Sequence, residues 1–477
     1  MTYRNQLLVD GEWLDGGGTP FAVLDPSTER PIAEVQTATD DDLRRALEAA
    51  ARGGKTWAAV APWDRSLLLR EIAARMRDRA GDLGAIVTAE QGKTLAEGIG
   101  EVRVGADYFD WYADEARRIY GRVVPGRTAD RRMTITHEPV GPVAAFTPNN
   151  FPWALPARKV AAALAAGCSM VLKPAEDTPL SALAMAELCQ DAGLPAGVLN
   201  VVTGDPAHIS SVLVGSPVIR KISLTGSVAV GKLLLALGAQ GVKRASMELG
   251  GHSPVLVLAD ADPVAAARAA VASKFRNCGQ VCVSPSRFLV SAAVYDEFVA
   301  EMVRQTEKLV VGPGTEAGSE TGPLVSARRR AAVEELVEDA RGKGAKVLTG
   351  GERTPGRPSG YYYQPTVLTD LTPDMRVLTE EPFGPLAPVV RFDDLDEAIE
   401  IANGVEVGLA GYVFGTDVLE AERVAARLDV GMVSVNSYLL ALPEAPFGGI
   451  KHSGYGHEGG SEGILDYLSV RYVNAPC

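Results

Sequence analysis

The chain has 477 residues, of which 46% are hydrophobic and 22% charged. This composition is typical of a folded protein with two or three domains. The net charge of −13 argues against a nucleic-acid or anionic-membrane partner, because no broad basic surface is available. The longest nearly apolar run, residues 160–172, is too short to span a bilayer, and the N-terminus has no apolar signal segment.

The cysteines are too few for a disulfide scaffold, and their number is odd. We therefore expect a cytoplasmic protein in which a special cysteine serves chemistry rather than structure. The five are Cys168, Cys189, Cys278, Cys282 and Cys477.

The first 140 residues favour helices followed by an exposed ribbon. Helical spacing of apolar residues predicts helices over 39–52, 64–80 and 95–118, the first after a Thr/Asp cluster typical of an N-cap. Alternation then predicts a ribbon over 122–137, and residues 469–474 near the C-terminus look like a strand that joins it.

From residue 142 short apolar strands alternate with helices, which predicts an α/β fold with a doubly wound parallel sheet. A second run of the same kind begins after Glu248 and continues to about residue 450. Predicted strands in the first run cover 142–147, 168–173, 198–204 and 221–226, with helices over 154–166, 179–192 and 206–214. The second run has strands over 254–258 and 287–291 and helices over 263–274 and 293–308.

Cys282 follows a helix that we expect to end near Asn277, with Gly279 supplying the freedom to turn. Most lone cysteines are buried and inert. Two features elsewhere favour a nucleophile instead. Glu248 precedes two glycines on an expected loop, where partial burial would raise its pKa toward that of a general base. Asn150 follows a strand end, where its amide can donate to an oxyanion or serve only as turn chemistry.

Two further strand ends favour a dinucleotide. Thr225, Gly226 and Ser227 end a strand and open a helix that has Gly231 one turn on, an arrangement that offers amides to a pyrophosphate. Lys173 and Glu176 follow another strand end, where they can hold ribose hydroxyls. An acidic residue there favours NAD over NADP, because it repels a 2′-phosphate.

Together these segments resemble the aldehyde dehydrogenase superfamily over essentially the whole chain, and most closely its succinate-semialdehyde dehydrogenase branch. The branch resemblance rests on SKFRN at 273–277, RKVAAALAAGC at 158–168 and GPLAPV at 384–389. Six motifs stand in the family's order: KPAEDTP at 173–179, TGSxxxG at 225–231, the ELGG-type loop at Glu248, FxxxGQxC at 275–282, EEPFGP at 380–385 and PFGGIKxSG at 446–454.

The resemblance implies a Rossmann-like cofactor domain, a second α/β catalytic domain and a small β-ribbon for oligomerisation. The first would comprise residues 1–121 and 142–250, the second 251–452, and the ribbon element 122–141 and 464–477. A homodimer or homotetramer is expected, with no metal ion.

The resemblance also implies roles for single residues. Cys282 would attack the aldehyde, Asn150 and the Cys282 amide would hold the oxyanion, and Glu248 would activate water to release the acid from a thioester. Lys159 would support Asn150 or a proton path. The cofactor would be NAD, bound by Thr147, Pro148, Lys173, Glu176, Thr225, Gly226, Ser227 and Gly231, with Glu381 and Phe383 at the nicotinamide ribose.

In the semialdehyde branch two arginines hold the distal carboxylate of the substrate, and Arg158 and Arg276 fall on those positions. The alternative is that either one sits in a surface ion pair. Ala441 replaces the serine of the branch's substrate loop, Asn149 replaces an aromatic residue near the cofactor, and Ser284 replaces a second cysteine. A disulfide switch with that cysteine is therefore excluded, which leaves only a Cys278–Cys282 pair.

The sequence thus predicts NAD-dependent oxidation of a carboxylate-bearing semialdehyde such as succinate semialdehyde. Three alternatives stay open: a longer or more apolar aldehyde, transfer of the acyl group to CoA instead of water, and a silent binding protein on the same scaffold. Glu248 argues against the second, since hydrolysis needs a base.

Overall fold

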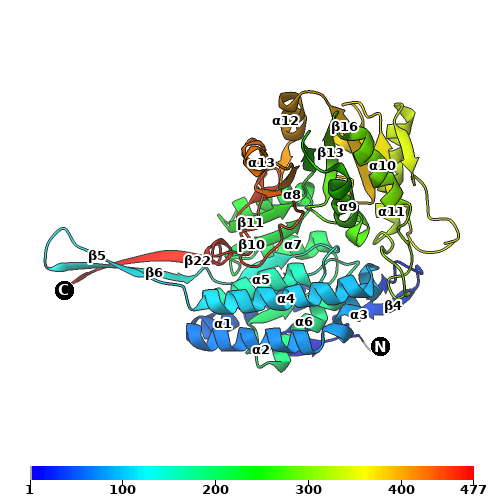
Figure 1. Cartoon of the computed structure of the whole chain (residues 1–477). Helices are drawn as coiled ribbons and strands as arrows, with labels where there is room; N and C mark the ends of the chain where they lie inside the picture. The colour runs from blue at the N-terminus through cyan, green and yellow to red at the C-terminus, as the bar shows by residue number, and fades with distance from the viewer. Residues whose placement is uncertain (1–2) are drawn as a thin grey trace.

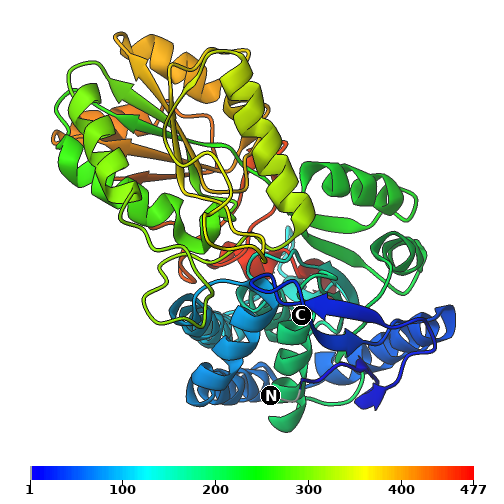
Figure 2. The ribbon, with the colours of Figure 1, turned by 90° about the vertical axis from the view of Figure 1, so that its right-hand side faces the viewer.

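The structure is a computed structural model that describes residues 3–477. Two large sheets, each covered by helices, form two lobes, and a narrow ribbon extends from the body (Figures 1 and 2). In Figure 2 the lobe built on the first sheet lies below the lobe built on the second. No helix in residues 3–477 is long and apolar enough to cross a membrane.

The first sheet has a parallel centre and antiparallel edges, in the order β2-β1-β9-β8-β7-β10-β11-β21. The chain builds outward from β7 in one direction through β8 and β9, then returns to add β10 and β11 on the other side. Ligands of doubly wound sheets bind at such a reversal, at the carboxyl ends of the strands. The strands are β1 (Leu7–Val9), β2 (Glu12–Leu14), β7 (Val143–Phe146), β8 (Met170–Lys173), β9 (Leu199–Val201), β10 (Lys221–Gly226), β11 (Arg244–Leu249) and β21 (Gly454–Tyr455).

Helices cover both faces of this sheet because its strands are apolar on both sides. In β7, Val143 and Ala145 pack into one core while Ala144 and Phe146 pack into the other. The first core contains α2 (Pro62–Asp78), α3 (Ala80–Gln91), α4 (Leu95–Ala116), α5 (Ala154–Ala166) and α6 (Leu180–Asp191). The second contains α1 (Asp40–Ala58), α7 (Pro206–Gly215) and α8 (Val228–Ala239).

The second sheet has the order β14-β15-β16-β13-β12-β18-β19 and is parallel except for β14 at its edge. Its strands are β12 (Ser253–Val257), β13 (Pro285–Ser291), β14 (Lys346–Thr349), β15 (Thr366–Thr369), β16 (Leu386–Phe392), β18 (Ala410–Phe414) and β19 (Met432–Val435). Helices α9 (Pro263–Lys274) and α10 (Tyr295–Thr306) cover one face, and α12 (Leu395–Asn403) and α13 (Val418–Ala425) the other. Helix α11 (Ala327–Gly342) packs beside β15.

The ribbon brings the segment 122–139 together with the C-terminal strand. Strand β6 (Arg131–Pro139) pairs with β5 (Arg122–Pro125) on one side and with β22 (Leu468–Pro476) on the other, with Val470 opposite His137. Figure 1 shows this ribbon as a long arm with the C-terminus at its tip. The predicted pairing of the C-terminal strand with the ribbon is confirmed. The remaining short elements are β3 (Phe21–Leu24), β4 (Pro31–Val35), β17 (Val407–Gly408), β20 (Ile450–Lys451), η1 (Arg276–Gly279), η2 (Arg376–Leu378) and α14 (Glu462–Leu465).

The prediction of two doubly wound α/β units is confirmed, and the predicted bounds of α5 and α9 match the observed ones. Three details differ. Helix α3 was not predicted, because its sequence has only weak helical amphipathicity. Glu248 lies within β11 rather than on a loop, and of the two ends expected for the helix before Cys282, Lys274 from the spacing is observed and Asn277 from the cysteine segment is not.

Candidate active site

The carboxyl ends of β7, β10 and β11 supply one side of the candidate site. Thr147 to Asn150 follow β7, Thr225 to Ser227 lie at the end of β10, and Glu248 is the last residue but one of β11. The reversal of strand order lies between β7 and β10, so these segments border the expected ligand crevice.

The Cys282 loop comes from the second lobe, between α9 and β13. Asn277, Cys278 and Gly279 have φ values of 49°, 54° and 72°, so the chain passes through three successive left-handed residues. A Cβ at Gly279 would overlap the Gly384 carbonyl, which explains the glycine. The sequence predicted an unusual backbone conformation at Gly279 alone. The structure places Asn277 and Cys278 in the left-handed region as well. All five cysteines are free thiols.

The Cys282 side chain is half-buried at the edge of the core of the second lobe, which Phe151, Tyr438, Leu440 and Ala441 also border. Loss of solvation raises the pKa of its thiol to about 12, and the carboxylates Glu381 and Glu248 act in the same direction. The Arg158 guanidinium opposes them and favours the thiolate. The thiol is therefore an acid that needs a base or a cation to become a nucleophile.

Glu248 is buried, with 2% of its surface exposed. Neither of its carboxylate oxygens has a hydrogen-bond partner within residues 3–477. Burial and the nearby Glu458 carboxylate raise its pKa well above the usual range, while Lys159 and Arg158 lower it. The sequence predicted a raised pKa from partial burial, and the observed burial is deeper.

Asn150 is buried beside the cysteine loop. Its Nδ2 donates to the Gln280 carbonyl at 3.0 Å, and its Oδ1 has no partner in the described part of the chain. An amide nitrogen carries two hydrogens, so one N–H remains for a ligand.

Lys159 lies on helix α5, of which every residue is buried. Its Nζ donates to Glu458 Oε1 at 2.6 Å and to Ser223 Oγ at 3.1 Å, and Tyr467 Oη donates to the same hydroxyl at 3.3 Å. Of the two roles expected for Lys159, these contacts favour the proton path over support of Asn150. Glu458 was not singled out from the sequence.

The two candidate substrate arginines differ in environment. Arg158 is buried between the rings of Tyr108 and Phe447, 4.7 and 4.6 Å from the ring centroids. Its NH1 lies 3.9 Å from Glu458 Oε2, and its Nε has no partner among residues 3–477. Arg276 is exposed above the Phe151 ring and is in no ion pair within the described residues. Neither arginine therefore sits in a surface ion pair.

The residues assigned to the cofactor fit a dinucleotide. Ser227 caps α8, with its Oγ accepting from the Val230 amide at 3.3 Å, and Thr225 Oγ1 is buried without a partner in the described chain. A Cβ at Gly231 would overlap Leu249, so glycine lets the helix approach the strand. The Thr147 amide donates to the Lys173 carbonyl at 3.3 Å and half-buried Pro148 follows, which places this loop beside the end of β8.

Two carboxylates border this region. Lys173 pairs with Glu176. Glu381 Oε1 accepts from the Gly251 amide at 3.4 Å, and burial raises its pKa to about 8. Phe383, two residues on, has a φ of 43°, which turns the chain beside Glu381.

Asn149 stands where the family has an aromatic residue. Its Nδ2 donates to Asp177 Oδ2 at 2.8 Å. Asp177 directly follows Glu176. This bond ties the Asn150 loop to the loop that carries Glu176.

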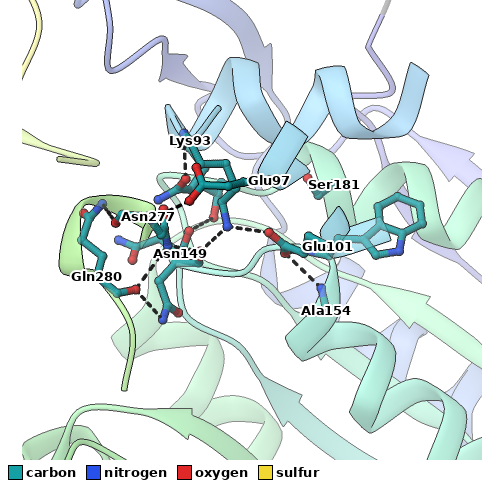
Figure 3. A network of polar contacts seen from close by, with 12 residues as sticks. Lys93, Glu97, Glu101, Asn149, Ala154, Ser181, Asn277 and Gln280 are labelled. Carbon is teal, nitrogen blue, oxygen red and sulfur yellow. Dashed lines mark hydrogen bonds and ion pairs between the residues drawn. The ribbon is translucent and has the colours of Figure 1, made fainter. Parts of the chain in front are cut away.

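A buried polar network behind Asn150 was not predicted (Figure 3). Lys93 lies just before α4, Glu97 and Glu101 lie in its first two turns, and Asn277 and Gln280 come from the cysteine loop. Gln280 and Asn277 stood in motifs quoted from the sequence, FxxxGQxC and SKFRN, whereas the three charged residues did not. The capping pattern of Thr94 and Glu97 was the one available signal for the others.

Comparison with known proteins agrees with this geometry. A model of the aldehyde dehydrogenase family matches residues 13–473. The chain is 46% identical to 3-sulfolactaldehyde dehydrogenase of Pseudomonas putida, covering 98% of this chain and 96% of that protein. It is 45% identical to glutarate-semialdehyde dehydrogenase of Pseudomonas aeruginosa, covering 99% and 97%. The crystal structure of succinate-semialdehyde dehydrogenase from Burkholderia pseudomallei superposes with a TM-score of 0.97 at 44% identity, covering 100% and 98%.

The chain belongs to the aldehyde dehydrogenase family. It is an oxidoreductase of that family, with the family's fold over its whole length.

Proposed function

We propose that the protein oxidises an ω-semialdehyde, an aldehyde with a distal carboxylate such as succinate or glutarate semialdehyde, to the carboxylic acid with NAD. The observation that carries this proposal is Arg158. Its guanidinium is buried near Cys282, its Nε lacks a partner within residues 3–477, and its nearest carboxylate oxygen is 3.9 Å away. A buried cation with so little compensation favours an anionic ligand. The three relatives named above carry the names of aldehydes that bear an anionic group.

Cys282 would attack the aldehyde carbon as a thiolate, its proton having left to solvent, and the Arg158 guanidinium favours this thiolate. The resulting oxyanion would accept from Asn150 Nδ2 and from the Cys282 backbone amide. NAD, when bound, supplies the hydride acceptor, and loss of hydride leaves a thioester on Cys282. Glu248 would then remove a proton from the water that attacks the thioester, releasing the acid and the thiolate.

The proton taken by Glu248 must reach solvent, and we assign Lys159 and Glu458 to that path. They are joined at 2.6 Å, they act on the pKa of Glu248 with opposite signs, and Ser223 and Tyr467 continue the hydrogen bonds away from it. These contacts support a path by which the proton leaves Glu248 through Lys159 and Glu458.

In this proposal the first sheet carries the cofactor and the second carries the nucleophile. Lys173 and Glu176 would hold the adenosine ribose, and Glu381 the nicotinamide ribose. Glu176 supports NAD over NADP, because a carboxylate repels a 2′-phosphate.

The test is a steady-state panel of succinate semialdehyde, glutarate semialdehyde, butanal and pentanal, each with NAD and with NADP. We expect kcat/KM to be about 100-fold higher for the anionic aldehydes than for the neutral ones. A preference for butanal or pentanal would refute the role of Arg158 and Arg276. Product that forms only with added CoA would favour acyl transfer to CoA. Cys282→Ala should abolish NADH formation, and retained activity would refute the covalent mechanism.

We also propose that the arm of β5, β6 and β22 joins subunits into a dimer or tetramer. It projects from the body and exposes Val123, Val470, Tyr472 and Val473. Exposed apolar side chains on a projecting sheet favour burial against a second copy. Light scattering of the protein with and without Val470→Lys and Tyr472→Lys tests this, since unchanged mass would exclude the arm.

A further inference from the structure

Behind Asn150 lies an ion pair that the proposed reaction does not use. Lys93, just before α4, and Glu101, in the second turn of α4, are joined at 2.5 Å, and their side chains are 1% and 2% exposed. Lys93 Nζ also donates to the Asn150 carbonyl at 2.8 Å and lies 4.0 Å from the centroid of the Phe151 ring. The pair therefore contacts the backbone of the oxyanion candidate directly.

The other oxygen of Glu101 fixes the next segment. Glu101 Oε1 accepts from the Trp153 and Ala154 amides at 2.8 and 3.1 Å. These amides begin α5, whose own N-cap residue makes no side-chain cap bond. Glu101 is therefore a remote cap for the helix that carries Arg158 and Lys159.

A third charged residue, in the first turn of α4, reaches the cysteine loop. Glu97 Oε1 accepts from the Asn277 amide at 2.7 Å, while Glu97 Oε2 is held by the Thr94 amide and hydroxyl at 2.9 and 3.0 Å. Asn277 is the first of the left-handed residues in that loop. The capping carboxylate thus holds a strained turn that belongs to the other lobe.

The contacts from Lys93 and those from the cysteine loop meet at the carbonyl oxygen of Asn150. The Asn150 carbonyl accepts both from Lys93 Nζ at 2.8 Å and from Asn277 Nδ2 at 2.9 Å. Asn277 Nδ2 also donates to the Gln280 carbonyl at 3.2 Å, which in turn accepts from Asn150 Nδ2. The position of the Asn150 amide relative to the cysteine loop is therefore set from α4.

We propose that Lys93 is a positioning residue for catalysis: with Glu97 and Glu101 it fixes Asn150 and the cysteine loop in one register across the two lobes. This inference rests on the proposed use of Asn150 as the oxyanion donor. Lys93 is 1% exposed and contacts the Asn150 carbonyl, so it would act through Asn150. A misplacement of about 1 Å in such a donor is enough to cost about 100-fold in rate.

The main test is a double-mutant cycle between the pair and Asn150, with succinate semialdehyde and NAD. Lys93→Met with Glu101→Gln removes both charges together and keeps an acceptor for the α5 amides. We expect kcat/KM to fall at least about 10-fold in the otherwise unchanged enzyme, but less than about 3-fold in the Asn150→Ala background. The rate of Cys282 alkylation by iodoacetamide should change less than the rate of oxidation.

Equal losses in both backgrounds would overturn the proposal, because a general loss of structure is additive with Asn150→Ala. Unchanged kcat/KM in the double variant would overturn it too. If Asn150→Ala itself has no effect, the proposed function of Asn150 fails, which is a different result. Glu301→Gln is the matched control: it also removes a largely buried ion-paired carboxylate, on α10, and should lower Tm without a selective loss of kcat.

A second variant avoids any unpaired charge if the first does not fold. Asn277→Gly suits the positive φ and removes the Nδ2 donor to the Asn150 carbonyl. We expect kcat to fall about 3- to 10-fold with Tm unchanged or higher. Full kcat in Asn277→Gly would overturn the proposal whatever the first variant does.

Discussion

Lys159 Nζ lies 2.6 Å from Glu458 Oε1, and both side chains are buried next to Glu248 although they are 299 residues apart in the sequence. The lysine lowers the pKa of Glu248 and the glutamate raises it. The two charges therefore shift the pKa of the Glu248 carboxyl in opposite directions.

The first prediction concerns the pH dependence of kcat. Glu248 acts as a base only when ionised, so kcat should rise with pH through its raised pKa. Lys159→Met removes a charge that stabilises the carboxylate and should move this rise to higher pH, by about one unit. Glu458→Gln should move it to lower pH.

A pH series of kcat with succinate semialdehyde and NAD measures both shifts. Lys346→Met is the control, since it makes the same change in an exposed ion pair with Asp370. Shifts in the same direction for the two variants would contradict the opposed roles.

The sequence predicted the sheets well because their signals are local. The bounds of α5 and β10 follow from apolar runs ended by glycine. Lys93 and Glu458 gave no such signal. Each is a charged residue that is buried next to a partner on another element, and the spacing of residues along the chain does not reveal that burial. The same limit applies to Arg158, whose stacking between two rings depends on tertiary packing.

The second prediction separates the two halves of the reaction. Glu248→Gln keeps the size of the side chain but removes the base that we propose activates water. Rapid mixing should show a burst of NADH approaching one per active site, followed by a steady rate about 100- to 10,000-fold below that of the unchanged enzyme. A steady rate within 3-fold of normal would show that Glu248 is not the deacylation base.

The third prediction compares the two arginines. Arg158→Met should reduce the ratio of kcat/KM for succinate semialdehyde to that for butanal by about 30-fold or more, because a buried cation binds the carboxylate with little screening. Arg158→Met should also lower kcat/KM for butanal, by less than for succinate semialdehyde, since Arg158 lowers the pKa of Cys282. Arg276→Met should act mainly on KM, by about 10-fold and less at high salt, because Arg276 is exposed.

Arg268→Met is the control for this comparison, since it removes an exposed arginine of α9 that pairs with Glu301. An unchanged ratio in Arg158→Met would remove the basis for a semialdehyde substrate.

The last prediction concerns the choice of cofactor, which in our proposal depends on the carboxylate of Glu176. Glu176 is 41% exposed and pairs with Lys173, whose side chain is 6% exposed. In Glu176→Gln the lysine would lose its ion-pair partner and become available to a 2′-phosphate, while the repulsion of that phosphate would disappear. The ratio of kcat/KM for NADP to that for NAD should rise about 10-fold or more, since each change favours the phosphate. Asp177→Asn is the matched control, because Asp177 is the next residue and binds Asn149 instead. It removes the same charge one residue away, so a rise of equal size in Asp177→Asn would assign the effect to the general field of the loop and not to Glu176.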